Sequence, residues 1–112
     1  ISLIALADDS QAPGVFQAAA DLDLSVPGDL SVLGFGNQDH RSASALGLTT
    51  VEWPLKEMTE AAVASIINVI EGRSPMTDVH PSASIDEETP DGTPIATIPT
   101  RPVWRSSVAR RS

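Results

Sequence analysis

The chain has 112 residues, 41% of them apolar, and a mean hydropathy of zero, which is typical of one globular domain with a hydrophobic core. Fifteen acidic against seven basic residues give a net charge of −8, which disfavours binding of the chain alone to nucleic acid or anionic lipid. The chain contains no cysteine, which excludes disulfides and thiolate chemistry, and no apolar run long enough to cross a bilayer. We expect a cytoplasmic protein that does not contact membranes.

Two short apolar runs predict strands that are buried on both faces, as in a parallel sheet. The first is Ser2–Ala7, and the second, Leu30–Phe35, follows the turn-forming segment Val26–Asp29. Between them, apolar residues at helical spacing predict a helix from about Ser10 to Asp23, with Pro13 in its first turn. The order strand, helix, strand predicts an α/β fold, a parallel sheet with helical crossovers.

The middle of the chain predicts a loop, a third strand and a second helix. Gly36–Gly47 is polar and aperiodic, and we expect a loop at the carboxyl end of the second strand, where open α/β sheets bind ligands. Leu48–Glu52 predicts the third strand. Apolar residues then recur every three or four positions and predict a helix over Pro54–Glu71, followed by Gly72 as its left-handed cap.

Prolines and acidic residues are concentrated in the last third of the chain, where six of the nine prolines occur. This composition predicts an acidic loop over residues 73–93. Short strands at Pro94–Ile98 and Val103–Arg105 and a frayed tail with Arg110 and Arg111 complete the predicted elements. So few strands would leave the sheet uncovered, and the chain opens in the middle of a strand, so we expect the parent protein to contain further elements.

Four motifs resemble the effector-binding domain of the lactose and galactose repressor family of bacterial transcription regulators. In chain order they are Ala5–Asp9 with Ala12 and Gly14, Val26–Phe35, Leu48–Leu55, and Ile98–Pro99 with Arg105 and Ser107. The resemblance covers about residues 1–72 and 94–108, the last third or so of a family member. It implies a partial type I periplasmic-binding-protein-like fold.

The resemblance also implies a division of the chain and a function. Residues 1–52 and about 100–108 would form part of the C-terminal subdomain, and residues 53–99, with the acidic loop 73–93, part of the N-terminal subdomain. The chain lacks the family's DNA-binding headpiece, so we expect contact with DNA only through such a headpiece. The implied function is sensing of a small polar effector, such as a sugar, by a non-enzymatic dimeric regulator. The alternative is a sugar-binding protein of an import system with the same fold.

The resemblance places three candidate ligand-binding residues in the effector cleft. Asp8 matches a cleft-facing Asn or Asp and either accepts hydrogen bonds from ligand hydroxyls or caps the next helix, whereas we expect Asp9 to act as a cap. Gly36 stands where the family usually has a sugar-binding Asp. Either Asn37 substitutes for that residue, or the effector is not a typical sugar, or effector binding has decayed. Trp53 replaces a Gln and either stacks on a ligand ring or fills the gap between subdomains.

The resemblance implies a homodimer that forms through the C-terminal subdomain. Family members pair through the helix after the first strand and the loop before the third. In this chain the corresponding residues are Ala12, Pro13, Phe16 and Gln17, together with Ala43, Ser44, Ala45 and Leu46. Small apolar residues allow close approach of two backbones. The alternative is that Phe16 is buried in its own subdomain and the alanines only line a loop.

The sequence contains no constellation typical of catalysis or metal binding. The paired acids Asp8–Asp9 and Glu87–Glu88 are adjacent, so their side chains point in different directions. His40 and His80 lie in predicted loops without metal-ligand spacing, and we expect them to be solvated. Trp104 is expected to pack in the core or on the surface. We therefore expect no enzymatic activity, no metal and no cofactor.

Overall fold

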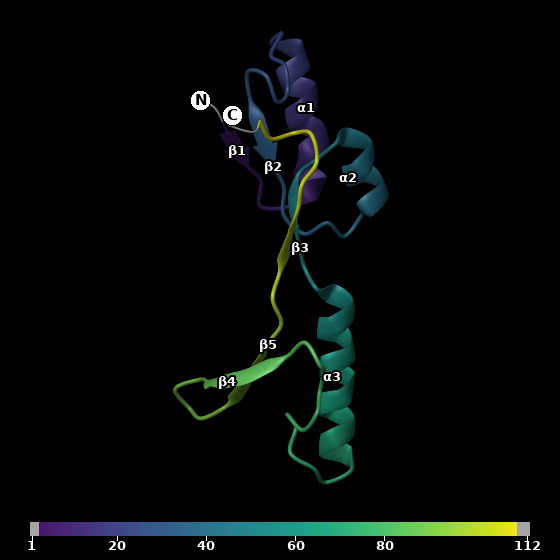
Figure 1. Cartoon of the computed structure of the whole chain (residues 1–112), viewed down its shortest axis with the longest axis vertical. Helices are drawn as coiled ribbons and strands as arrows, with labels where there is room; N and C mark the ends of the chain where they lie inside the picture. The colour runs from purple at the N-terminus through teal and green to yellow at the C-terminus, as the bar shows by residue number, and fades with distance from the viewer. Residues whose placement is uncertain (1–2, 110–112) are drawn as a thin grey trace. The chain divides into compact units, whose positions relative to one another are not determined.

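The computed structural model describes residues 3–109 and divides the chain into two compact units (Figure 1). Unit 1 comprises the described residues of Ile1–Trp53 and Arg101–Ser112, and unit 2 comprises Pro54–Thr100. The chain therefore passes from one unit to the other twice, after Trp53 and after Thr100. The predicted tail with Arg110 and Arg111 lies outside the described residues.

The strands of unit 1 form a mixed arrangement whose first members are parallel. Strands β1 (Leu3–Ala5) and β2 (Ser31–Leu33) pair in parallel. Isolated parallel bridges join the β2 segment to that of β3 (Thr50–Glu52), and β3 pairs antiparallel with β6 (Arg101–Val103). The predicted α/β class with parallel strands is confirmed. The last strand begins two residues earlier than the predicted Val103–Arg105.

Three helical segments connect these strands. The short 3-10 helix η1 (Asp9–Gln11) leads directly into α1 (Ala12–Asp21), which returns the chain from β1 to β2. Pro13 lies in the first turn of α1, where its missing N–H costs no helical hydrogen bond. The third segment, α2 (His40–Leu46), lies between β2 and β3.

Helix α2 corrects the prediction of a loop over Gly36–Gly47. The helix has only seven residues, too few to show a hydrophobic period in the sequence. Its ends nevertheless carry recognisable signals. The Asp39 carboxylate accepts the backbone N–H of Ser42 at 3.1 Å, and Gly47 adopts the left-handed conformation with φ 66°. An N-cap aspartate and a C-cap glycine with seven residues between them were thus the available signal.

The core of unit 1 lies between the helices and the strands. Its buried members are Ala12, Leu30, Val32, Ala43 and Leu48, and Leu6, Val15, Phe16, Val26 and Leu46 pack around them. These residues come from α1, α2 and the strand segments, so burial of their side chains holds the helices on the sheet.

Strand β1 is more exposed than predicted. Its three residues are all exposed, with Leu3 at 49% and Ile4 at 36%. Among the described residues β1 pairs only with β2, so it forms an edge of the sheet. The apolar composition of Ser2–Ala7 identified a strand correctly, but the burial of both faces depends on neighbours that the sequence of the run does not specify.

Unit 2 consists of one long helix and a hairpin. Helix α3 (Leu55–Ile70) confirms the prediction over Pro54–Glu71, and Gly72 follows it with φ 74°. Strands β4 (Ser84–Glu88) and β5 (Pro94–Thr97) pair antiparallel. Strand β4 lies inside the predicted acidic loop 73–93, so that prediction was wrong for Ser84–Glu88. A polar segment can form a strand here because pairing with β5 satisfies its backbone polar groups without a large apolar core.

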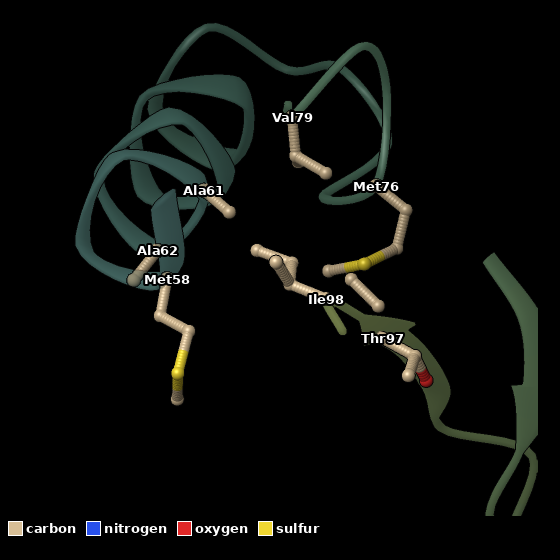
Figure 2. A pocket seen from close by; sticks show the side chains of 8 residues that line it. Met58, Ala61, Ala62, Met76, Val79, Thr97 and Ile98 are labelled. Carbon is tan, nitrogen blue, oxygen red and sulfur yellow. The ribbon is translucent and has the colours of Figure 1, made fainter. Parts of the chain in front are cut away.

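Helix α3 packs on unit 2 through its smaller side chains. Ala61 and Asn68 are buried, whereas most large apolar residues of the helix are exposed, namely Leu55, Met58, Val63, Ile66, Ile67, Val69 and Ile70. A pocket of about 400 Å³ lies between α3 and the residues around β5 (Figure 2), and it is lined by Met58, Ala61, Ala62, Met76, Val79, Ala96, Thr97 and Ile98. Every helix in residues 3–109 is too short or too polar to span a bilayer.

Candidate functional site

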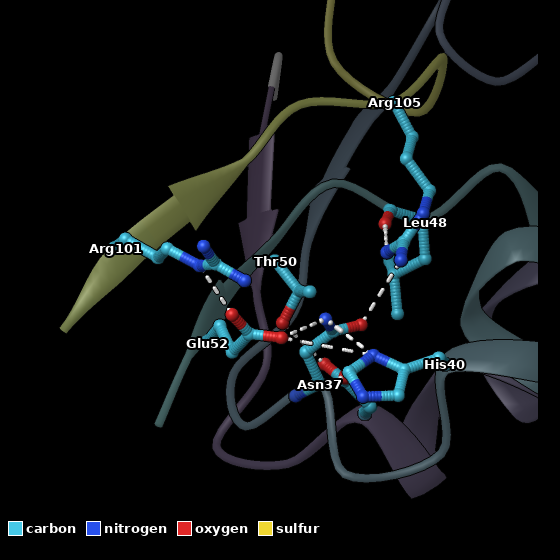
Figure 3. A network of polar contacts seen from close by, with 8 residues as sticks. Asn37, His40, Leu48, Thr50, Glu52, Arg101 and Arg105 are labelled. Carbon is cyan, nitrogen blue, oxygen red and sulfur yellow. Dashed lines mark hydrogen bonds and ion pairs between the residues drawn. The ribbon is translucent and has the colours of Figure 1, made fainter. Parts of the chain in front are cut away.

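Polar side chains gather where β2 and β3 of unit 1 end (Figure 3). The carboxyl ends of parallel strands meet at one edge of a sheet, so residues distant in sequence come together there. The group consists of Asp9, Asn37, His40, Thr50, Glu52, Arg101 and Arg105. We call these seven residues the polar network.

Asn37 is the centre of the polar network and is 3% exposed. Its Oδ1 accepts from Arg105 Nη2 at 3.0 Å, and because arginine can only donate, this bond assigns the orientation of the amide. The Nδ2 atom then donates to Glu52 Oε1 at 3.0 Å and contacts His40 Nδ1 at 2.9 Å. With the amide in this orientation, His40 Nδ1 is the acceptor of that contact. The Asn37 side chain is therefore occupied by protein groups.

Asp9 joins three segments of unit 1. Its Oδ2 accepts the backbone N–H of Asn37 at 2.8 Å, and its Oδ1 accepts the Thr50 hydroxyl at 2.7 Å. Its own N–H donates to Phe35 O at 3.1 Å. A Cβ on Gly34 would lie 2.1 Å from Asp9 Oδ1, so only glycine at position 34 leaves room for the carboxylate.

Asp8, and not Asp9 as predicted, is the capping residue. Its Oδ1 accepts the backbone N–H of Ser10 at 2.8 Å, and its own N–H donates to Gln11 Oε1 at 3.3 Å, which together form a capping box on η1. Hydrogen bonds from the hydroxyl and the backbone N–H of Ser10 hold the pKa of the Asp8 carboxyl below its usual value. Asp8 is also exposed, and because its pKa is lowered its carboxyl is ionised at neutral pH.

Glu52 connects Asn37 to the end of β6. The two residues Glu52 and Arg101 face each other in the β3–β6 register, and Arg101 Nε donates to Glu52 Oε2. Glu52 Oε1 also lies 3.7 Å from His40 Nδ1. The hydrogen bond from Arg101, with a smaller contribution from Asn37, holds the pKa of Glu52 below its usual value. Glu52 and Arg101 are next to the two positions at which the chain passes between the units, after Trp53 and after Thr100.

Arg105 and Ser107, two residues of the last sequence motif, bind the closing segment, residues 104–109 after β6, to the strands. Arg105 Nη1 donates to Leu48 O at 2.6 Å, and its backbone N–H donates to Thr49 Oγ1 at 2.9 Å. The buried Ser107 hydroxyl donates to Val32 O at 2.6 Å and accepts the Thr49 N–H at 2.8 Å. Sequence reasoning identified these residues only as a motif, and their structural role and the contact between Arg105 and Asn37 were missed.

Trp53 packs against Phe35 and remains partly exposed. The two ring centroids lie 5.5 Å apart with an interplanar angle of 78°, an edge-to-face arrangement. The side chain is 36% exposed, so part of the indole stays accessible.

A pocket of about 360 Å³ opens beside the polar network, between the start of α1 and α2. Its volume falls in the range of small-molecule sites. The lining residues are Asp8, Asp9, Ser10, Pro13, Phe35, Gly36, Gln38, Asp39, Ser42, Ala43 and Leu46. Of the three predicted ligand-binding residues, only Asp8 lines this pocket, whereas Asn37 lies in the network next to it and Trp53 contacts its Phe35 wall.

Two of the residues predicted for the dimer surface lie inside unit 1. Ala12 and Ala43 are 0% and 3% exposed and belong to the core, because α1 and α2 turn these faces toward the strands. The remaining predicted residues divide into exposed ones, Pro13, Gln17, Ser44 and Ala45, and half-buried ones, Phe16 and Leu46, which pack against the core.

The histidines differ from each other in their surroundings. The His40 side chain is 69% exposed, whereas His80, predicted to be solvated, is only 14% exposed and its Nε2 lies 2.9 Å from Glu60 Oε2. Trp104 lies on the surface and is 64% exposed. Within residues 3–109, no three His, Asp or Glu side chains are grouped so that they could hold a metal ion.

Comparison with known proteins gives matches along almost the whole chain. The family model of the periplasmic binding protein-like domain matches residues 2–108. The HTH-type transcriptional regulator MalR of Clostridium butyricum is 36% identical over 70 residues, which are 62% of this chain and 21% of that protein. The crystal structure of a LacI-family transcriptional regulator from Burkhoderia phymatum is 30% identical, with a TM-score of 0.67 over 98% of this chain and 34% of that one.

A third match shows the fold alone. It is the LacI-family transcriptional regulator from Enterococcus faecalis V583 with bound ribose, 20% identical, with a TM-score of 0.65 over 99% of this chain and 36% of that one. The chain thus spans about a fifth of the length of the matched MalR protein and about a third of these two solved regulators.

Proposed function

We propose that the chain is the effector-sensing and dimerisation part of a DNA-binding transcription regulator. The premise is that the chain belongs to the periplasmic-binding-protein-like domain family and to its lactose and galactose repressor branch. The observation that carries the proposal is the pocket at the carboxyl ends of the parallel strands β1 and β2, within the family match. Unit 1 would correspond to the C-terminal subdomain and unit 2 to part of the N-terminal subdomain. DNA contact would require a headpiece outside this chain, and the regulator would act in the cytoplasm.

The proposed effector is a small polar molecule such as a sugar. Asp8 is an exposed carboxylate on the pocket wall and can accept hydrogen bonds from hydroxyl groups. The exposed part of Trp53 offers an aromatic face on which a sugar ring can pack. The side-chain amide of Asn37 already contacts Arg105, Glu52 and His40, so we propose that Asn37 supports the pocket wall and does not bind the effector directly.

The proposed regulator is not an enzyme. The hydroxyl of Thr50, which donates to the Asp9 carboxylate, is fully buried, and the other hydrogen bonds of the polar network connect strands and loops to one another. Effector binding would act by shifting a conformational equilibrium that changes the DNA affinity of the headpiece.

Tryptophan fluorescence tests the proposed effector class. The chain has two tryptophans, so Trp104→Phe leaves Trp53 as the single reporter. We expect D-ribose or another pentose or hexose to change Trp53 emission with a saturable dependence on concentration. The matched control is Trp53→Phe, which keeps Trp104, an exposed residue that does not line the pocket, and should show no change. If no sugar alters Trp53 emission or releases heat in calorimetry, the sugar proposal is contradicted.

A second candidate is a sugar-binding protein of an import system. The name of the matching family model, a periplasmic binding protein-like domain, applies to such proteins as well. The residues encoded upstream of Ile1 distinguish the two candidates. A helix-turn-helix supports the regulator, and a secretory signal peptide supports the import protein.

A further inference from the structure

We infer that Asp9 is the positioning residue of the candidate site: its carboxylate joins the Gly36–Asn37 loop, which borders the pocket, to η1 and to β3. This inference rests on the proposed function, because it concerns the same site. It assigns to Asp9 a role different from that of its neighbour Asp8, which lines the same pocket.

The contacts of Asp9 reach far along the chain. Its two oxygens accept from Asn37 N and Thr50 Oγ1, which lie 28 and 41 residues away in sequence. The carboxylate also occupies the space above Gly34 in the β2 segment, where a Cβ would collide with it. One side chain therefore connects η1, the loop after β2 and β3, and a hydrogen bond to a charged acceptor is stronger than one to a neutral acceptor.

The loop that Asp9 holds has an unusual backbone conformation. Gly36 and Asn37 have φ values of 120° and 52°, and a positive φ is unfavourable for a residue with a side chain. The ladder already fixes Gly36, whose N–H donates to Val51 O at 2.8 Å and whose carbonyl accepts from Trp53 N at 3.1 Å. The Asn37 N–H has Asp9 as its acceptor, so this bond fixes the loop on the Asn37 side.

Asp8 provides a natural comparison within the same pocket. Its carboxylate accepts from Ser10, two residues away, and its contacts stay within the first turn of the helix. Neutralising Asp8 removes the same charge as neutralising Asp9 but leaves the bonds to Asn37 and Thr50 intact. The variants Asp8→Asn and Asp9→Asn are therefore a matched pair of the same size and charge change.

Amide NMR spectra of the chain test the positioning role without any effector. In Asp9→Asn a neutral oxygen replaces the carboxylate, so we expect the Asn37 amide proton to move upfield, with smaller changes at Gly36 and Thr50. In Asp8→Asn we expect changes only near residues 7–11 and an unchanged Asn37 resonance. An Asn37 resonance that stays in place in Asp9→Asn, or that moves equally in both variants, overturns the inference.

Binding of D-ribose separates positioning from direct contact with the effector. We expect Asp9→Ala to bind about ten- to a hundred-fold more weakly, as for loss of a charged hydrogen bond. Asp9→Asn should recover most of this loss, because its Oδ1 can accept from Asn37 N and its amide can donate to the Thr50 hydroxyl. Equal weakening in both variants overturns the positioning role. If the unmodified protein binds no sugar, the proposed function fails, while the Asn37 resonance still decides the role of Asp9.

Discussion

Glu52 is the residue at which the polar network meets the β3–β6 ladder. Its side chain is 15% exposed and bonds Arg101 through one oxygen and Asn37 through the other. Both bonds need the ionised carboxylate as acceptor, and the bond from Arg101 is the main cause of the lowered pKa of Glu52. A group whose pKa is lower in the folded than in the unfolded state stabilises the fold above its unfolded pKa and loses that contribution as the pH falls through its folded pKa.

We predict that Glu52→Gln lowers the free energy of unfolding at neutral pH by roughly 1 kcal/mol, a modest value because Arg101 is 76% exposed. The difference between the unmodified chain and the variant should shrink as the pH falls below the usual pKa of a glutamate, about 4.3, and through the lower pKa of Glu52 in the folded chain, because glutamine does not titrate. Urea unfolding at several pH values measures this difference.

The control for this prediction is the partner residue. In an Arg101→Gln background the effect of Glu52→Gln at neutral pH should be smaller, because the main cause of the lowered Glu52 pKa is gone. A difference in unfolding free energy that does not depend on pH, or that is unaffected by Arg101→Gln, contradicts the assignment.

The closing segment after β6 connects two secondary-structure elements, because it forms hydrogen bonds both with β2 and with the residues just before β3. Ser107 N donates to Gly47 O at 2.9 Å, and Val32 N donates to Ser107 O at 2.8 Å. The Ser107 hydroxyl adds two further bonds, one to each strand segment. The segment therefore supplies backbone partners along the β2 and β3 segments, and it does so beside the polar network.

We predict that Ser107→Ala destabilises the chain by about 1–3 kcal/mol, because it leaves the buried Thr49 N–H and Val32 carbonyl without the hydroxyl. The neighbouring Ser106 is exposed, and Ser106→Ala should change stability by about 0.5 kcal/mol or less. Chemical denaturation of both variants measures the two effects. Equal effects at positions 106 and 107 would show that the hydroxyl of Ser107 does not fasten the segment.

At the scale of the whole molecule, the exposed parts of α1 and α2 define the proposed dimer surface. Ala45 and Ser44 on α2 and Pro13 on α1 are exposed, whereas Ala12 and Ala43 are withdrawn into the core. In a dimer with a two-fold axis such a patch faces its own copy, so one substitution there introduces two like charges into the interface.

We predict that Ala45→Glu converts the proposed dimer of the parent protein to a monomer, because it places two carboxylates in an interface formed by small residues. The control is Ala18→Glu, which adds the same charge at an exposed position of α1 away from Pro13 and Phe16. Sedimentation equilibrium measures the mass of each form. A parent protein that remains dimeric with Ala45→Glu places the interface elsewhere.

Local patterns in the sequence predicted most of the elements. Helix α3 and its terminal Gly72 follow from apolar spacing and cap chemistry, and the β2 segment follows from an apolar run after a turn. Helix α2 and strand β4 were missed because a seven-residue helix and a polar hairpin strand lack a hydrophobic period. The burial of Ala43 was also missed, because it depends on helix α2, which the sequence pattern did not predict.

The sequence by itself determined the family, the α/β class and the approximate order of the elements, because motifs, periodicity and turn residues are properties of neighbouring residues. Only the tertiary structure decided which of two adjacent aspartates caps a helix and which joins the loop after β2 to β3. The cap bond of Asp8 spans two residues, whereas the bonds of Asp9 span 28 and 41. Contacts over such separations exist only once the strands have paired, so no local pattern at residues 8 and 9 encodes them.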